Sequence, residues 1–201
     1  MRMMFFFQSV SLDGFFEGPD HDISWHNVDD EFNRFAIEQL RETDTILFGR
    51  RTYQLFESYW PGVTRASGAS DENIEIARLI NNMNKVVFSR TLSGVEEKEN
   101  WRNVRLVHEA SPEEIRSWKQ RPGKALSVGG NNLAVSLARM GLIDELRIMV
   151  MPVLLGKGNR LFSDANEKMN LRLVSTRAFK SGNVLLCYRR ENSNTAQSNA
   201  G

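Results

Sequence analysis

Three short segments carry the residue types that proteins use to bind phosphate. Each follows an apolar run typical of a buried strand: Gly49, Arg50, Arg51 and Thr52 in the first, Ser89, Arg90 and Thr91 in the second, and Gly129, Gly130, Asn131 and Asn132 in the third. A glycine lets a ligand approach the backbone closely or gives the backbone a positive φ, and the N-terminus of a following helix offers free N–H groups to an anion. Arginine adds bidentate contacts to a further phosphate. Together the segments predict a dinucleotide site.

Each segment by itself has a simpler explanation. Two adjacent glycines before a helix can form a tight turn, neighbouring arginines can be solvated, and a Ser-Arg-Thr sequence can simply lead a strand into a turn. The functional interpretation depends on all three lying at one edge of a sheet, because ligands of open α/β sheets bind beyond the carboxyl ends of strands. The sequence has no Walker A motif and no G-x-G-x-x-G after the first strand, and residues 156–161 (GKGNRL) lie in the predicted antiparallel part and do not replace them.

Strand and helix patterns alternate along residues 3–141, and this arrangement would place the three segments at one edge. Apolar runs predict strands at residues 3–10, 45–48, 86–88, 104–107 and 125–128. Helices are predicted between most of them, with Asn27, Ser70 and Ser111 as N-caps.

The alternation stops after Gly141, where a helix ends. Residues 146–155, 171–179 and 184–190 are strand-like runs without a helix between them, which predicts antiparallel strands with residues 180–183 as a hairpin loop. The predicted fold is therefore α/β, a three-layer sandwich with a mainly parallel central sheet and an antiparallel C-terminal hairpin. We expect a single domain over residues 1–190 and a flexible polar tail over residues 191–201.

Composition excludes several classes of function. The chain has 201 residues with 26 Lys plus Arg and 25 Asp plus Glu, a net charge of +1, which leaves no broad basic face for nucleic acid. No apolar run approaches the roughly 20 residues of a membrane span, so we expect no membrane partner and a cytoplasmic protein.

Cysteine and histidine add no predicted chemistry. The single cysteine, Cys187, lies in a strand-like run and is predicted to be a packed residue. The segment DHDISWH could hold a metal ion through Asp20, His21, Asp22 and His26. Its spacing matches no firm metal motif, so a solvated loop is the better interpretation and no metal is predicted.

Four motifs in a fixed order resemble a known superfamily. They are SLDGFFEGPD, TILFGRRTYQLF, KVVFSRTL and the long stretch LSVGGNNLAVSLARMGLIDELRIMVMPVLLGKGNRLF. Their order and spacing resemble the dihydrofolate-reductase-like superfamily, most closely the bacterial group related to the C-terminal reductase domain of riboflavin biosynthesis, from residue 3 to about residue 190. The resemblance implies a dihydrofolate-reductase-like fold, a homodimer and NADPH as the cofactor.

The resemblance also implies a role for each residue of the three segments. It assigns Gly49, Arg50, Arg51 and Thr52 to phosphate contact, Ser89, Arg90 and Thr91 to the region of the 2′-phosphate, and Gly129, Gly130 and Asn131 to the pyrophosphate. Close approach of this ligand would then explain the adjacent glycines. An arginine that pairs with the 2′-phosphate favours NADPH over NADH.

The substrate end follows the same resemblance, with one departure. Dihydrofolate reductases hold the pterin with an acidic residue in the helix before the Gly-Arg-x-Thr segment, and Asn33 stands at the matching place, which argues against folate reduction. Asp13 is our predicted catalytic, substrate-orienting acid, with a simple Asp-Gly turn as the alternative. Trp25 lies with it in the loop that would border the nicotinamide. Tyr53 and Phe56 are predicted substrate-binding residues, although their helical spacing fits core packing better.

We therefore expect an NADPH-dependent reductase that positions the nicotinamide C4 against a planar heterocycle, a pterin or an aminopyrimidine. A riboflavin-pathway substrate would carry a ribose phosphate, whose basic pocket the sequence does not reveal. The alternative is a nucleotide-binding module without turnover, with the same three segments but no competent substrate pocket.

Overall fold

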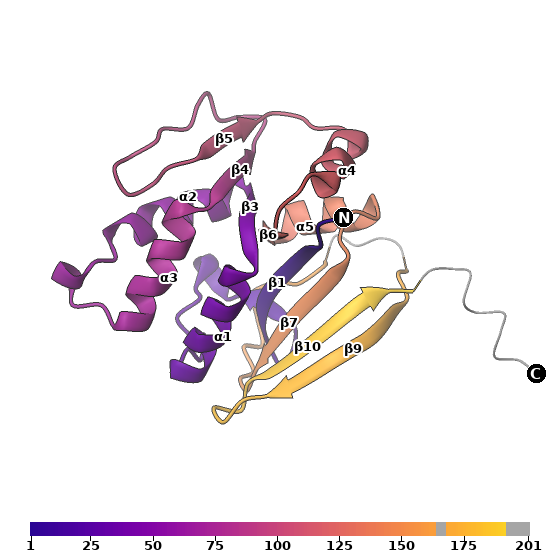
Figure 1. Ribbon diagram of the computed structural model, residues 1–201. Coiled ribbons are helices and arrows are strands. Elements are labelled where there is room, and N and C mark those ends of the chain that lie inside the picture. The colour runs from indigo at the N-terminus through magenta and orange to yellow at the C-terminus, as the bar shows by residue number, and fades with distance from the viewer. Residues whose placement is uncertain (164–167, 192–201) are drawn as a thin grey trace, which may run out of the picture.

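The computed structural model describes residues 1–163 and 168–191, and its main element is an eight-stranded sheet (Figure 1). The strand order is β5-β4-β3-β6-β1-β7-β10-β9. The strands are β1 (Met4–Ser11), β3 (Thr43–Gly49), β4 (Asn84–Phe88), β5 (Val104–Val107), β6 (Ala125–Gly129), β7 (Glu145–Met151), β9 (Leu171–Ala178) and β10 (Val184–Arg190). Neighbours are parallel, except that β10 is antiparallel to both β7 and β9. The predicted mainly parallel sheet with an antiparallel C-terminal hairpin is confirmed. Beyond residue 191, the predicted tail lies outside the described residues.

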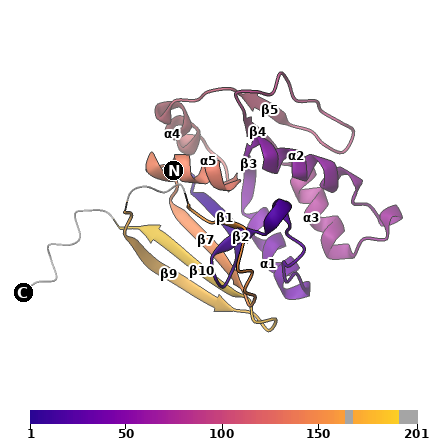
Figure 2. The same cartoon turned by 180° about the vertical axis from the view of Figure 1, so that it is seen from behind.

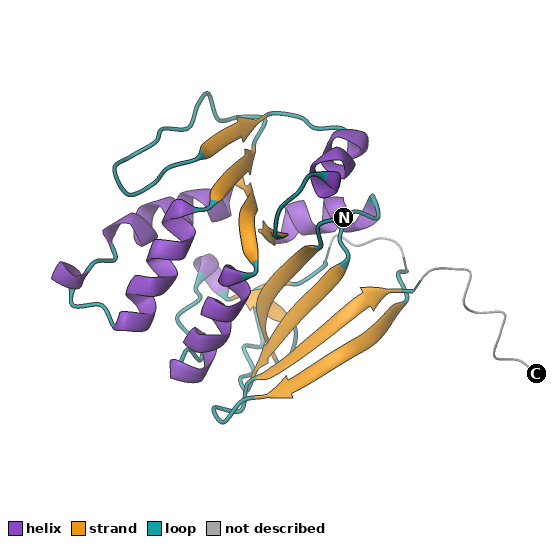
Figure 3. Ribbon diagram, viewed as in Figure 1, coloured by secondary structure: helices purple, strands orange, loops and turns teal. Residues whose placement is uncertain are grey.

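Helices cover both faces of the sheet, which Figures 1 and 2 show from opposite sides and Figure 3 shows by element type. They are α1 (Asp30–Arg41), α2 (Arg50–Tyr59), α3 (Asp71–Asn82), α4 (Pro112–Gln120) and α5 (Asn131–Arg139). Alternate residues of a strand face opposite sides, so Leu47 packs with α4 and α5, whereas Ile46 and Phe48 pack with α2 and α3. Helix α1 adds Phe35 to a third apolar cluster over β7 and β10. The predicted three-layer sandwich results from this alternation.

The helix starts follow the capping chemistry of the sequence with one exception. Ser70 and Ser111 cap α3 and α4 as predicted. Helix α1 begins after Asp29, whose carboxylate accepts the N–H three residues on at 2.8 Å, and the prediction of Asn27 as its cap was wrong. The Asn27 side chain donates instead to the Ser181 carbonyl, 3.0 Å away in the hairpin loop. That contact joins residues 154 positions apart, which a local pattern does not reveal.

The strands after α5 differ in length from the predicted ones. Strand β7 ends at Met151, because Pro152 has no N–H to continue the ladder. The hairpin loop is at residues 180–183 as predicted, and the Phe179 N–H donates to the Asn183 carbonyl at 2.8 Å. A separate two-stranded sheet pairs β2 (Phe15–Glu17) with β8 (Asn159–Arg160). Short 3₁₀ turns lie at Pro19–His21, Trp60–Gly62 and Arg65–Ser67. Within the described residues, no helix is long and apolar enough to cross a bilayer.

Candidate functional site

The three predicted phosphate-binding segments leave the sheet side by side. Strands β4, β3 and β6 are neighbours and run in the same direction. Gly49 pairs with Phe88 and Phe48 pairs with Gly129, so the three strands end within about one residue of the same level. The segments therefore share the carboxyl edge of the sheet, where α/β proteins bind their ligands.

Two helix N-termini meet at this edge. Helices α2 and α5 have Gly49 and Gly130 as their N-caps, and neither helix receives a side-chain cap. A Cβ on Gly130 would lie 3.7 Å from the Gly49 nitrogen and 2.8 Å from Thr52 Oγ1, so the two first turns are in contact. Uncapped N–H groups and the positive ends of two helix dipoles thus converge, which is the arrangement that binds phosphate.

The adjacent glycines have a reason within the protein itself. Gly130 has φ of +110°, a conformation that residues with side chains rarely adopt. A Cβ on Gly129 would lie 2.8 Å from the Phe48 ring. The positive φ of Gly130 and the Phe48 ring beside Gly129 therefore require glycine even without a ligand, and close approach of a ligand to these glycines stays a prediction.

The arginines of the site differ in their surroundings. Arg50 Nη1 donates to Thr91 Oγ1 at 2.7 Å, which ties the start of α2 to the exit of β4. Arg51 and Arg90 are exposed, and within residues 1–163 and 168–191 neither side chain makes a hydrogen bond or an ion pair. Two cationic side chains are thus available to an anion next to the Arg50–Thr91 contact.

Two polar side chains of the predicted cofactor site are occupied within the protein. Ser89 is buried, and its Oγ accepts the backbone N–H groups of Thr91 and Leu92 at 3.3 and 3.1 Å. Asn131 is 7% exposed, and its Oδ1 accepts the Phe162 N–H at 3.3 Å. The two oxygens therefore hold the turns in place, and the donors that these residues can offer an anion are their backbone N–H groups, the Ser89 hydroxyl and the Asn131 Nδ2 amide.

Asp13 lies at the exit of β1, and its carboxylate already accepts three hydrogen bonds. Oδ1 accepts from Ser11 Oγ at 2.6 Å and from the Leu155 N–H at 3.1 Å, while Oδ2 accepts from the Gly156 N–H at 2.8 Å. The Ser11 hydroxyl, followed by the Gly156 and Leu155 amides, lowers the pKa of the Asp13 carboxyl to about 2 against the opposing effect of desolvation. Asp13 is therefore ionised at neutral pH and joins two loops.

The predicted substrate-binding aromatics are not gathered in one wall. Tyr53 is 2% exposed, and its hydroxyl accepts the Trp101 Nε1–H at 3.3 Å within the cluster between β3 and α3. Phe56 packs on Phe48 with ring centroids 5.0 Å apart. Trp25 donates its Nε1–H to a carbonyl in its own turn and packs on the cluster beneath α1. Core packing accounts for Tyr53 and Phe56, as their helical spacing suggested.

Residues 155–162 lie at the same edge, which the sequence analysis missed by placing GKGNRL only in the antiparallel part. The loop contacts Asp13 at one end and Asn131 at the other. The signal in the sequence was the pair Gly156 and Gly158, whose φ values are +72° and +138°.

The histidine-containing segment makes contacts of its own. His21 Nδ1 is 2.8 Å from Glu17 Oε1, and burial lowers the pKa of His26 because it disfavours the charged ring. Among the residues that the structure describes, no three His, Cys, Asp or Glu side chains come together as a metal ion would need.

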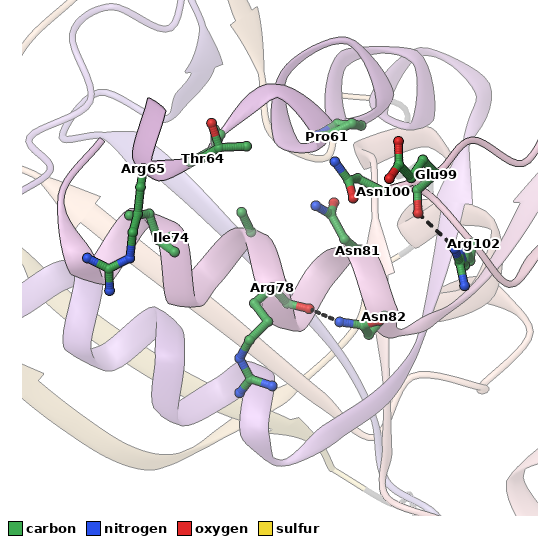
Figure 4. Close-up of a pocket in the computed structure, with 12 residues that line it drawn as sticks. Pro61, Thr64, Arg65, Ile74, Arg78, Asn81, Asn82, Glu99, Asn100 and Arg102 are labelled. Carbon is green, nitrogen blue, oxygen red and sulfur yellow. Dashed lines mark hydrogen bonds between the residues drawn. The ribbon is translucent and has the colours of Figure 1, made fainter. Parts of the chain in front are cut away.

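A cavity of about 370 Å³ lies elsewhere, beside α3 (Figure 4). It includes Asn81 and Asn82, the last residues of α3, which precede β4 and so lie at the end of that strand opposite Ser89. Its arginines already have partners: Arg65 pairs with Asp71, Arg78 with Glu75, and Arg102 donates to the Glu99 carbonyl. None of the predicted site residues lines this cavity.

Comparisons with known proteins identify the family and the fold of this chain. A family model described as the RibD C-terminal domain matches residues 2–185. The uncharacterized protein YyaP of Bacillus subtilis (strain 168) is 34% identical over 181 residues, which cover 90% of each chain.

Two solved structures share the fold. One is the diaminohydroxyphosphoribosylaminopyrimidine deaminase/5-amino-6-(5-phosphoribosylamino)uracil reductase of Thermotoga maritima, with a TM-score of 0.64, 16% identity, and coverage of 94% of this chain and 57% of that chain. The other is the dihydrofolate reductase of Enterococcus faecalis complexed with NADP(H) and RAB-propyl, with a TM-score of 0.56, 14% identity, and coverage of 94% and 97%. At such identities the likeness shows the dihydrofolate-reductase-like fold.

Proposed function

This chain belongs to the RibD C-terminal domain family, a family of NAD(P)H-dependent pyrimidine reductases, and from that premise we propose that it is an NADPH-dependent reductase of a pterin or an aminopyrimidine-type heterocycle. The observation that most supports the proposal is the contact between the uncapped N-termini of α2 and α5 at the shared edge of β4, β3 and β6. A single helix N-terminus after a strand is common in any α/β fold. Two N-termini in contact can offer N–H groups to both phosphates of a diphosphate.

The residues present fit this cofactor. Backbone N–H groups in the first turns of α2 and α5 would hold the pyrophosphate, with Gly130 keeping side chains out of the space between them. Arg90 and Arg51 would pair with the 2′-phosphate, beside the Arg50–Thr91 hydrogen bond. When bound, the nicotinamide supplies the hydride.

Asp13 fits a role in orienting the substrate but not in donating a proton. Its low pKa keeps the carboxylate ionised at neutral pH. A carboxylate offers about four lone-pair positions, and three are taken by Ser11, Leu155 and Gly156. One acceptor position on Oδ2 remains for an amino group of a pterin or an aminopyrimidine.

The alternative, a nucleotide-binding module without turnover, is supported by a different observation. The cavity beside α3 contains none of the predicted substrate residues, and Tyr53 is in the core. Stoichiometric NADPH binding without oxidation by dihydropterins, pterins or aminopyrimidines would favour the module over the reductase.

Titration with NADPH and NADH tests the cofactor assignment. We expect wild type to bind NADPH about tenfold more tightly than NADH, because one charge-assisted contact to the 2′-phosphate contributes roughly that factor. Arg90→Ala and Arg51→Ala should each weaken NADPH binding and so narrow this difference in affinity, because both arginines are assigned to the 2′-phosphate. Arg41→Ala is the control, since this exposed arginine is the last residue of α1 and precedes β3, at the opposite end of that strand from Gly49.

Equal affinities for the two nucleotides in wild type would remove the NADPH assignment. If both site variants keep the wild-type difference between the affinities for NADPH and NADH, the assignment of the 2′-phosphate to these arginines is wrong.

A further inference from the structure

Residues 155–162 form a loop that lies against two separate parts of the proposed site. At its first end the Leu155 and Gly156 N–H groups donate to the Asp13 carboxylate. Further on, the Leu161 N–H donates to the Gly14 carbonyl at 3.0 Å. Arg160 Nη1 donates to the Asp13 carbonyl at 2.9 Å. Within the loop, Asn159–Arg160 form β8, which pairs with β2. The first end of the loop is therefore bonded to the exit of β1 through Asp13, and its middle is bonded to β2 as well.

The other end of the loop is bonded to α5. The Phe162 N–H donates to Asn131 Oδ1 at 3.3 Å, and the Phe162 ring packs on Phe6 with centroids 6.0 Å apart. Asn131 is the first residue of α5, whose first-turn N–H groups are assigned above to the pyrophosphate. Asn side chains readily accept such N–H groups, and the bond to Phe162 occupies this one elsewhere.

We propose that Asp13 and Asn131 are positioning residues, which hold loop 155–162 so that Asn131 Oδ1 stays engaged with Phe162 and leaves the N-terminus of α5 free for the cofactor. Asp13 acts through the loop: when its carboxylate is removed, the loop loosens, Phe162 releases Asn131, and the freed oxygen competes with phosphate for N–H groups. The inference rests on the proposed function, because it assumes that α5 binds the pyrophosphate.

Limited trypsin digestion tests, without any ligand, whether Asp13 holds loop 155–162 in place. Lys157 is exposed within the loop and is followed by Gly158, so cleavage between them reports loop opening. We expect Asp13→Ala to speed this cleavage about tenfold, since three hydrogen bonds to a charged group are lost. Cleavage after Lys180, in the hairpin loop, is the internal reference, measured by mass spectrometry.

Asp22→Ala is the matched control variant. Its carboxylate accepts the Ser24 N–H within its own turn at 2.9 Å. It should leave cleavage after Lys157 at the wild-type rate. Should Asp13→Ala fail to fold, Asp13→Asn keeps the side-chain volume but replaces one acceptor oxygen with an NH2 group, so it loses at least one of the three hydrogen bonds and should speed the cleavage by a smaller factor. A rate after Lys157 that matches wild type in the folded Asp13 variant overturns the proposal.

A double-mutant cycle tests whether Asp13 affects cofactor binding through Asn131. We expect Asp13→Ala to weaken NADPH binding about tenfold when Asn131 is present. In an Asn131→Ala background, where the competing oxygen is gone, the further loss caused by Asp13→Ala should fall to about twofold or less. Equal losses in the two backgrounds would overturn the proposed action through Asn131.

Failure of the proposed function and failure of this inference give different results. If wild type binds no NADPH while Asp13→Ala still opens the loop to trypsin, the proposed function fails and the loop attachment stands. If wild type binds NADPH and the Asp13 and Asn131 effects are independent, the proposed function stands and this inference fails.

Discussion

At the scale of single residues, the site depends on positions where a side chain would not fit. Gly130 combines a φ of +110° with Thr52 Oγ1 only 2.8 Å from where its Cβ would lie. The two causes are independent, because one concerns backbone conformation and the other concerns the contact between α2 and α5. A substitution therefore strains the backbone and separates the two helix N-termini at once.

Gly130→Ala should lower the free energy of unfolding by about 1–3 kcal/mol, the cost of holding a residue with a side chain in such a conformation. Urea denaturation followed by circular dichroism measures the change. Gly62→Ala is the control, because nothing lies within 4 Å of its added Cβ. If the two variants lose equal stability, the conformation at Gly130 is not strained.

At the scale of elements, local capping chemistry and one distant contact together determine where α1 begins. Both Asn27 and Asp29 are residue types that cap helices well, although only Asn27 was predicted to cap α1. The hairpin loop engages Asn27 through Ser181, and Asp29 then caps the helix. The start of α1 is thus chosen by β9 and β10, which come some 140 residues later.

Asp29→Ala should destabilise the protein by about 1 kcal/mol, because the N-cap acceptor for an α1 N–H is lost. Asp30→Ala is the matched control: this exposed carboxylate is in the first turn and interacts chiefly with the helix dipole, so its loss should cost only a few tenths of a kcal/mol. Thermal unfolding of both variants is the measurement. A larger loss in Asp30→Ala would mean that Asp29 is not the effective cap.

At the scale of the whole molecule, β9 forms one edge of the eight-stranded sheet. Its apolar side chains Leu171, Leu173 and Val174 are 38%, 47% and 39% exposed. Exposed apolar side chains on an edge strand favour association with another sheet. This supports the homodimer that the family resemblance implies, with β9 as a contact surface.

Sedimentation velocity tests that proposal. Wild type should sediment as a dimer at micromolar concentration, and Leu173→Lys should shift it toward monomer because a charge would be buried in the contact. Leu55→Lys is the control, since this exposed apolar residue lies on α2, which covers β3 and β4, whereas β9 is at the other end of the sheet. A monomeric wild type, or a Leu173→Lys protein that remains dimeric, contradicts a β9 contact.

Local patterns in the sequence determined the elements and the chemistry at their ends. Apolar runs predicted the buried strands, Ser70 and Ser111 predicted two helix starts, and the turn residues at 180–183 predicted the hairpin. These signals are readable because their causes act between residues a few positions apart. For the same reason the sequence identified the three segments that carry glycine, hydroxyl and arginine groups.

Only the tertiary structure decided which groups meet. The sheet order brings β4, β3 and β6 together and inserts β10 between β7 and β9. Asp13 accepts hydrogen bonds from Leu155 and Gly156, more than 140 residues away, and Asn131 is bonded to Phe162. The periodicity of a strand or helix does not show which distant group will accept a hydrogen bond from it, because that pairing depends on how the strands and helices pack. The residue types at the site were therefore visible in the sequence, whereas their partners, and hence which groups remain free for a ligand, were not.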